Sequence, residues 1–363
     1  MKNTFGNSLS VTIFGESHGE AVGVVLDGLA PGISVDNEKI DKWLSLRRPS
    51  GKISTSRKEA DEYRIVSGVF NGYTTGTPLT VLIPNTNVNS KAYDPSVPRP
   101  GHADLTAQYK YHGYQDYRGG GHFSGRITAA LVVAGAIVAS ALEKKGIEIG
   151  THISSLADIK DRDFADFSAD IKALSTLPFP VLDENTAKRM QNKIEAVAEE
   201  GDSVGGVLET VVLGVPAGVG EPWFDTVEGV ISHALFSVPA IKGVEFGDGF
   251  AMTEMKGSEA NDSFRVKDGK IVTETNRNGG INGGITNGMP IIFRSAVKPT
   301  PSIFKPQKSV DLGSMENAEL NINGRHDPAI IHRARIVVDS VTAIAFYDLL
   351  SMRYGTDYFF DKQ

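Results

Sequence analysis

The chain contains no cysteine, and this single absence excludes several classes of site. Without thiol groups the protein has no disulfide framework, no thiolate nucleophile and no zinc–thiolate centre. A chain without cysteine suits a reducing compartment, so we expect a cytoplasmic protein.

Long apolar segments are also missing. The N-terminal residues lack the apolar core of a signal peptide. The longest uncharged segment, Ile127 to Leu142, is shorter than the roughly 20 residues that a membrane-spanning helix needs. Its alanine and glycine residues favour a helix packed tightly inside the protein. We therefore expect no association with a membrane.

Positively charged side chains are fewer than negatively charged ones. The 363 residues include 37 Lys and Arg against 44 Asp and Glu, which gives a net charge of −7. A general nucleic-acid-binding protein would carry a basic face, so we expect no nucleic-acid partner. With 40% hydrophobic residues, the chain is long enough to bury a large core.

Glycine, in contrast, is abundant, with 39 residues gathered mainly in segments 15–32, 113–125, 201–220 and 279–288. Glycine tolerates positive φ angles and lets the backbone approach a neighbour closely. We interpret these clusters as loops that face a ligand. Ordinary turns are the alternative, but they do not explain three consecutive glycines at Gly119, Gly120 and Gly121.

The hydrophobic periodicity indicates an α+β fold with antiparallel sheets and helices packed against them. Asp36 is the expected N-cap of the first helix, and Asp225 with Glu228 matches a capping box. Residues 84–122 lack clear periodicity, and a connection of that length is usually functional or disordered; its many tyrosines argue against disorder. The expected strands are 10–14, 23–26, 63–69, 78–83, 207–215 and 290–297, and the expected helices are 36–48, 125–145, 185–200, 225–236 and 333–352.

Two pairs of segments resemble each other within the chain. GYTTGTPLTVLI, which begins at Gly72, is similar to GGITNGMPIIFR, which begins at Gly283. Before them, VVLDGLAPG from Val24 is similar to VVLGVPAG from Val211, in the same order. The hypothesis is an internal two-fold repeat, and a chance match is the alternative.

The segment GESHG, residues 15–19, formally matches the G-x-S-x-G turn of many hydrolases. That turn requires a strand before it and a helix after it. A strand pattern precedes GESHG, but the following residues also read as a strand. The pattern therefore argues against a hydrolase. Ser17 and His18 stand between Gly15 and Gly19, and these glycines have no side chains to shield them.

The segment YRGGGHFSGR, residues 117–126, has the features of an anion site. It lacks the Gly-Lys-Ser/Thr of a P-loop and the spacing of a dinucleotide-binding turn. A glycine-rich turn that enters a helix N-terminus presents free N–H groups and a positive dipole end. Arg126 at this helix start is unfavourable unless an anion is bound beside it. A salt bridge to a nearby acid is the alternative.

Positive and titratable side chains gather in three more loops. These are RPGHAD at 99–104, LRRPSGKISTSRK at 46–58 and NGRHDP at 323–328. Convergent arginines suit a small polyanion, because the guanidinium group matches carboxylate and phosphate oxygens. Histidine suits proton transfer near neutral pH. No His, Asp or Glu cluster has convincing metal spacing, so we expect no metal.

Together these segments resemble the chorismate synthase family, in the family's order and over nearly the whole chain. Several of the segments are long and unusual, which makes the resemblance specific. The matching segments are GESHG (15–19), LRRPSG (46–51), SGVFNGYTTGTP (67–78), RPGHAD (99–104), DYRGGGHFSGR (116–126), EGDSVGG (200–206), IKGVEFGDGF (241–250), NGGINGGITNGMPI (278–291), KPTPSI (298–303) and GRHDP (324–328).

The resemblance implies a β-α-β sandwich in which residues 1–363 form one domain. It implies a lyase of the shikimate pathway that converts 5-enolpyruvylshikimate 3-phosphate to chorismate and phosphate by 1,4-anti elimination. The cofactor is reduced FMN, which an external flavin reductase or another source supplies, and NADP is associated with the activity. A homotetramer is typical of the family. A homologue that binds flavin or phosphate without catalysis is the alternative.

The resemblance also assigns residues to roles. His102 matches the general acid near the departing phosphate, and His18 matches the histidine beside the reduced flavin. Ser17 and Asp327 match a pair that relays a proton. The residues implied to bind substrate anions are Arg47, Arg48, Arg99, Ser124, Arg126 and Arg325. Those implied to bind FMN are His122, Phe123, Ser124, Pro239, Ala240, Gly283, Lys298, Pro299, Thr300, Pro301, Ser302 and Arg325.

The chain departs from the commoner family pattern in the glycine-rich loop. His122 stands where many members have arginine, and Phe123 stands where many have serine. One cation is therefore lost, or is present only while His122 is protonated. Lys52 and Pro239 also replace commoner residues. These departures affect side-chain roles more than backbone roles.

Overall fold

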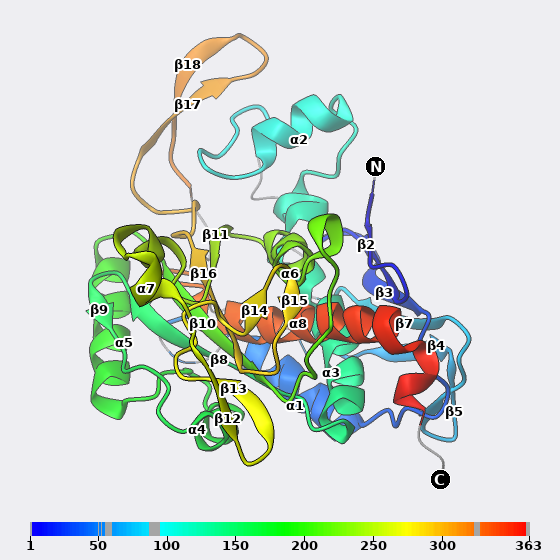
Figure 1. Ribbon diagram of the computed structural model, residues 1–363. Helices are drawn as coiled ribbons and strands as arrows, with labels where there is room; N and C mark the ends of the chain where they lie inside the picture. Colours follow the sequence, from blue (N-terminus) through cyan, green and yellow to red (C-terminus); the bar gives the residue numbers. More distant parts are fainter. Residues whose placement is uncertain are drawn as a thin grey trace.

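Two five-stranded antiparallel sheets form the outer layers of this computed structural model, which describes residues 2–49, 51, 53–54, 60–86, 95–322 and 327–360 (Figure 1). In spatial order, the first sheet contains β1 (Thr4–Phe5), β2 (Ser10–Gly15), β3 (Ala21–Asp27), β7 (Leu79–Pro84) and β4 (Arg64–Ser67). The second contains β11 (Ile241–Phe246), β16 (Ile291–Val297), β10 (Gly206–Leu213), β8 (Glu148–Leu156) and β9 (Ile159–Lys160). The expected α+β fold with antiparallel sheets is confirmed.

Strand periodicity explains how each sheet faces the helices. In β7, Leu79, Val81 and Ile83 are buried and alternate with partly exposed residues. In β16, Ile291 and Phe293 alternate in the same way. Because side chains point to opposite faces at a period of two, each sheet buries one apolar face. These faces join the residues of the helices in one hydrophobic cluster.

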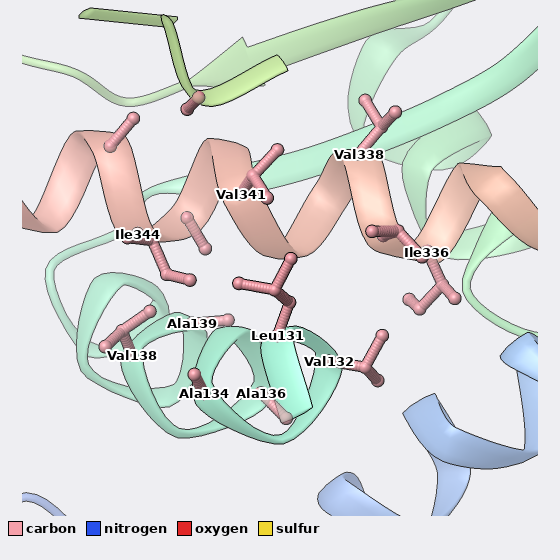
Figure 2. Close-up of a cluster of buried hydrophobic side chains, with 14 of the residues drawn as sticks. Leu131, Val132, Ala134, Ala136, Val138, Ala139, Ile336, Val338, Val341 and Ile344 are labelled. Atoms are coloured by element: carbon pink, nitrogen blue, oxygen red, sulfur yellow. The ribbon is translucent and has the colours of Figure 1, made fainter. Parts of the chain in front are cut away.

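Two long helices, α3 (Thr128–Lys144) and α8 (Ile331–Tyr354), pack against each other in the core. Figure 2 shows Leu131 of α3 pointing toward α8, and Ile344 of α8 pointing toward α3. A Cβ atom on Gly135 of α3 would lie 2.4 Å from Cβ of Ser340. The helices therefore approach closely only because position 135 is glycine.

The segment Gly125–Lys144 is long and apolar enough to cross a membrane. However, 89% of its most apolar window is buried inside the protein. The alanine-rich helix expected at 125–145 is thus a core helix. Its first residues, Gly125–Ile127, form a 3₁₀ turn, η3, that leads into α3.

The two sheets share one topology, which supports the internal repeat. The spatial order β2-β3-β7-β4 in the first sheet corresponds to β8-β10-β16-β11 in the second. In chain order, α1 (Asn37–Arg47) follows β3 as α6 (Val227–Phe236) follows β10, and α3 and α8 follow β7 and β16. The segments that resemble each other are neighbouring strands in both sheets, β3 with β7 and β10 with β16.

Most predicted elements are present with similar boundaries, but the strands β1, β8, β9 and β11 and the helix α4 (Phe167–Leu174) were not predicted. Asp36 caps α1 by accepting a hydrogen bond from the Lys39 amide. The capping box expected at Asp225 is wrong, because Thr226 is the N-cap of α6 and accepts from the Gly229 amide. Within residues 84–122, the chain forms α2 (Asp104–Tyr111), which the periodicity did not predict. Ala107 is its one buried residue, so α2 has no apolar stripe.

The remaining elements surround the two sheets. The hairpin of β17 (Gln307–Asp311) and β18 (Glu316–Leu320) extends away from them, on the same side as α2 (Figure 1). The other helices are α4 (Phe167–Leu174), α5 (Glu184–Glu199) and α7 (Gly257–Ala260). The other strands are β5 (Val69–Phe70), β6 (Tyr73–Thr74), β12 (Phe264–Lys267), β13 (Lys270–Thr273), β14 (Ile281–Asn282) and β15 (Ile285–Thr286).

Candidate functional site

The glycine-rich loop lies against the turn between β2 and β3. The Ser17 amide donates a hydrogen bond to the Gly121 carbonyl oxygen over 3.0 Å. Nδ1 of His122 lies 2.8 Å from the carbonyl oxygen of Gly15, so it carries a hydrogen and donates it. GESHG is a hairpin turn between two strands, which agrees with the expectation that it is not a hydrolase nucleophile turn.

Gly119 and Gly120 each lie against one of the two histidines that are candidate catalytic residues. Both glycines have positive φ angles, 61° and 82°. A Cβ atom on Gly119 would lie 2.6 Å from Nε2 of His18 and 2.9 Å from Oγ of Ser17. A Cβ atom on Gly120 would lie 3.3 Å from Cε1 of His102. The bare backbone of this loop therefore lets His18 and His102 approach it from different segments of the chain.

The Ser17 hydroxyl is buried and has no hydrogen-bond partner among the described residues. The same is true of Oγ1 of Thr300. Burying a hydroxyl group without a partner costs free energy, and buried polar atoms normally have a partner. Ser17 consequently makes no hydrogen bond to the Asp327 carboxylate within the described structure, although the resemblance pairs the two.

His102 is held by Asp104, an acid whose role was not predicted from the sequence. Its Nδ1 lies 2.7 Å from Oδ1 of Asp104. Arg99 binds the same carboxylate through Nε and Nη2, at 2.7 and 2.8 Å, and through its backbone amide. Burial by itself raises the pKa of Asp104, but hydrogen bonds from Arg99 and His102 outweigh it and hold this pKa well below its usual range. Asp104 is therefore ionised.

The segment Lys298–Ser302 lies against the loop that carries His102. Nζ of Lys298 donates a hydrogen bond to the Gly101 carbonyl oxygen. A Cβ atom on Gly101 would lie 3.3 Å from Cβ of Pro301. The Lys298 amide also donates to the carbonyl oxygen of Ala240, a residue with a φ angle of 75°. Two of the segments implied to bind FMN, at 239–240 and 298–302, are thus adjacent in space.

Three arginines implied to bind the substrate converge on one carboxylate, that of Asp61. Nη2 of Arg47 lies 2.8 Å from it, and Nε of Arg48 lies 3.6 Å from it. Nη1 of Arg126 also pairs with Asp61. Burial by itself raises the pKa of Asp61, but Arg47 and Arg126 outweigh it and lower this pKa below its ordinary value. For Arg126, the salt bridge considered as the alternative is therefore present.

Arg126 and Arg48 differ in their exposure. Nε and Nη2 of Arg126 also donate to Asn85 and to the Pro84 carbonyl oxygen, and its side chain is almost fully buried. The Arg48 side chain is 34% exposed. In this structure Arg48 is therefore the most accessible of the three arginines for an incoming anion.

Asp327 connects to the arginine cluster through Arg333. Nη1 of Arg333 lies 2.6 Å from the Asp327 carboxylate, and its Nε donates to the Arg47 carbonyl oxygen. Arg333 was not assigned a role from the sequence, although its position at the start of a core helix is a signal. Arg325, implied to bind both substrate and FMN, lies outside the described residues.

The remaining candidates lie at the edges of the loop or on other turns. Ser124 caps η3 by accepting from the Arg126 amide. The Phe123 ring is 39% exposed and contacts the ring of Tyr111 edge-on. Pro239 is exposed after α6, and Gly283 lies in the exposed turn between β14 and β15.

Comparison with known proteins identifies the chain's relatives. A family model described as chorismate synthase matches residues 9–351. The chain belongs to the chorismate synthase family. Chorismate synthase from Thermococcus kodakarensis is 47% identical over 350 residues, which cover 96% of this chain and 97% of that protein. Chorismate synthase from Pyrococcus abyssi is 48% identical with the same coverage.

A solved structure supports the same relationship. The structure titled "Crystal Structure of Chorismate Synthase" superposes with a TM-score of 0.75 at 27% sequence identity. The match covers 96% of this chain and 94% of that one. The β-α-β sandwich expected from the resemblance is confirmed, and the family is one of carbon–oxygen lyases.

Proposed function

We propose that this protein converts 5-enolpyruvylshikimate 3-phosphate to chorismate and inorganic phosphate. In this elimination the carbon–oxygen bond to phosphate and a ring carbon–hydrogen bond break, and a second ring double bond forms. The observation that supports the proposal most directly is the contact of one glycine loop with both His18 and His102. These two histidines come from the segments GESHG and RPGHAD, which carry the family resemblance.

The residues present fit a flavin. The buried hydroxyl groups of Ser17 and Thr300 lack partners among the described residues, so each is available to a bound ligand. Reduced FMN would supply electron density to the allylic centre as the phosphate departs. The residues that would hold it are His122, Phe123, Ser124, Pro239, Ala240, Gly283, Lys298, Pro299, Thr300, Pro301, Ser302 and Arg325.

His102 acts as the general acid for the departing phosphate. Its Nδ1 faces Asp104, so Nε2 is the atom left to deliver a proton. Nε2 also belongs to the ring edge that lies against Gly120. Ser17 and Asp327 relay the proton that the elimination removes, and His18, beside Ser17, supports the charge of the bound cofactor.

The arginines hold the carboxylates and the phosphate of the substrate. Arg48 offers the most exposed guanidinium group, while Arg47 and Arg126 act from behind it with Asp61 between them. Arg99, Ser124 and Arg325 complete the proposed set. Guanidinium groups suit this task because they form paired hydrogen bonds with carboxylate and phosphate oxygens.

We also propose the biological setting that the family relationship implies. The protein works as a homotetramer in the cytoplasm, on the shikimate pathway. A separate flavin reductase, or another source, delivers reduced FMN, with NADP as the associated nucleotide. The expectations of one domain over residues 1–363 and of no metal stay predictions.

The test is an anaerobic incubation of the protein with reduced FMN and 5-enolpyruvylshikimate 3-phosphate. Chorismate and phosphate are both measured, with and without flavin. The proposal predicts that both products appear only when reduced FMN is present. Phosphate release without flavin would favour a phosphatase, and flavin binding without any product would favour a non-catalytic homologue.

A further inference from the structure

Asp104 contacts His102 in a way that fixes where the imidazole carries its hydrogen. Oδ1 of Asp104 lies 2.7 Å from Nδ1 of His102. Two guanidinium nitrogens and the backbone amide of Arg99 donate to the same carboxylate, so it is ionised and can only accept hydrogen bonds. If Nδ1 lacked a hydrogen, two lone pairs would face each other at this distance. Nη2 of Arg99 also lies 3.2 Å from Nδ1, and a guanidinium group can only donate. The contact of Nδ1 with the ionised Asp104 carboxylate is shorter, at 2.7 Å, so Nδ1 carries the hydrogen and donates it to Asp104, while Nη2 of Arg99 donates to the carboxylate.

The opposite edge of the imidazole faces the glycine loop. A Cβ atom on Gly120 would lie 3.3 Å from Cε1 and 3.5 Å from Nε2 of His102. The ring is thus held at Nδ1 by Asp104 and bounded at its other edge by bare backbone. The orientation of His102 depends on both neighbours.

We propose that Asp104 is the positioning residue for His102: it keeps a hydrogen on Nδ1 and aims Nε2 at the glycine loop, so that when the ring carries hydrogens on both nitrogens the proton that it gives up is the one on Nε2. This inference rests on the proposed function, in which Nε2 delivers the proton to the departing phosphate. Arg99 is the second member of the arrangement, because it orients the Asp104 carboxylate through three hydrogen bonds. Its role in holding Asp104 is separate from any contact that it makes with substrate.

The competing explanation is that Asp104 only stabilises the local fold. It is the first residue of α2, where an acidic side chain is favourable. A matched control separates the two explanations. Asp170 in α4 accepts two guanidinium hydrogen bonds from Arg162 and one from the Ala165 amide, as Asp104 does from Arg99. Among the described residues, the side-chain hydrogen-bond partners of Asp170 include no histidine.

The first measurement follows the imidazole directly. The full-length protein is labelled with ¹⁵N-histidine, and the His102 signals are assigned by comparison with His102→Ala. In the wild type we expect a hydrogen on Nδ1 of His102, and in Asp104→Asn we expect that preference to be lost. Asp170→Asn should leave the His102 signals unchanged. A hydrogen fixed on Nδ1 in both the wild type and Asp104→Asn would overturn the inference.

The second measurement is steady-state turnover with reduced FMN. Asp104→Asn should lower kcat at least about tenfold with little change in KM, because orientation of a general acid acts on the chemical step. In a His102→Ala background the same substitution should change kcat little, since the two residues act as a unit. Asp170→Asn should keep wild-type kcat. Equal kcat in Asp104→Asn and Asp170→Asn would contradict the proposal.

The two measurements also separate this inference from the proposed function. If the wild type forms no chorismate under any condition, the proposed function fails, while the histidine signals still decide whether Asp104 positions His102. If the wild type is active and Asp104→Asn retains full kcat, the proposed function stands and the positioning role is wrong.

Discussion

A Cβ atom on Gly119 would lie 2.6 Å from Nε2 of His18, closer than real Cβ contacts allow. The neighbouring Gly120 has a similar but looser relation to His102. Two successive glycines thus make room for two histidines from distant segments. Positions 119 and 120 require glycine for two reasons: neighbouring side chains crowd them, and their backbone conformation favours glycine. Mutations can separate these two effects.

Gly119→Ala should lower kcat by roughly 100-fold, because it displaces His18 from its position beside the loop. Steady-state kinetics with reduced FMN checks this. The matched control is Gly269→Ala, in the turn between β12 and β13. Gly269 has a φ angle of 73°, and an added Cβ atom there meets open space. Gly269→Ala should lower the free energy of unfolding by about 1 kcal/mol and leave kcat unchanged. Equal kcat values in both variants would contradict the crowding argument.

His102→Ala should lower kcat by roughly 10² to 10⁴, the usual effect of losing a general acid. The substitution removes the imidazole that lies between Asp104 and Gly120. The measurement is chorismate formation under anaerobic conditions. Turnover close to that of the wild type would remove His102 from the mechanism.

Arg126→Ala tests whether a buried arginine also serves the substrate. The variant leaves the buried Asp61 carboxylate short of a partner, so we expect a loss of about 3 kcal/mol in unfolding free energy. If Arg126 also holds a substrate anion, KM should rise while kcat changes less. Reduced stability with an unchanged KM would make its role structural. Denaturant unfolding and steady-state kinetics on the same preparation give both numbers.

The stability of the protein should depend on pH through His152, which lies in β8 of the second sheet. Burial lowers the pKa of His152, but hydrogen bonds to Asp161 and Glu209, at 2.9 and 3.2 Å, outweigh it and raise this pKa above 6.5. Because the folded state binds the proton of His152 more tightly than the unfolded chain does, the contribution of His152 to the free energy of unfolding is fully present below the pKa that it has in the unfolded chain. It is lost as pH rises through the folded pKa.

His152→Gln checks that linkage. The difference in unfolding free energy between the wild type and this variant should be larger at about pH 6 than at about pH 9. Urea unfolding at a series of pH values measures it. A difference that is constant with pH would show that His152 is not charged in the folded protein.

The sequence predicted those parts of the fold that local patterns control. The strands β2, β3, β4, β7, β10 and β16 and the long helices follow from apolar periodicity, and Asp36 follows from cap chemistry. The strands β1, β8, β9 and β11 were not predicted. The helix α2 was missed because it is short and buries only Ala107. The cap of α6 was misplaced because Asp225 and Thr226 are both good cap residues, and the 3₁₀ turn η4 (Trp223–Asp225) contains the former.

The residue types that make up the site could be predicted from the sequence, but the partner of each side chain could not. Glycine-rich and arginine-rich loops indicated a polyanion site, since these residues act through backbone and charge. Asp61 could not be foreseen, because its role depends on a tertiary arrangement that brings Arg47 and Arg126 to one carboxylate. Asp104 belongs to the segment RPGHAD, but only the folded structure shows that it binds His102 and Arg99 together.

The central claim is that the protein performs a flavin-dependent elimination. Its most direct test is the ratio of chorismate to phosphate formed in one anaerobic reaction with 5-enolpyruvylshikimate 3-phosphate. A flavin-dependent elimination gives equal amounts of the two products, formed only with reduced FMN and nearly abolished in His102→Ala. Phosphate formed without an equal amount of chorismate, or formed equally well without flavin, would contradict it.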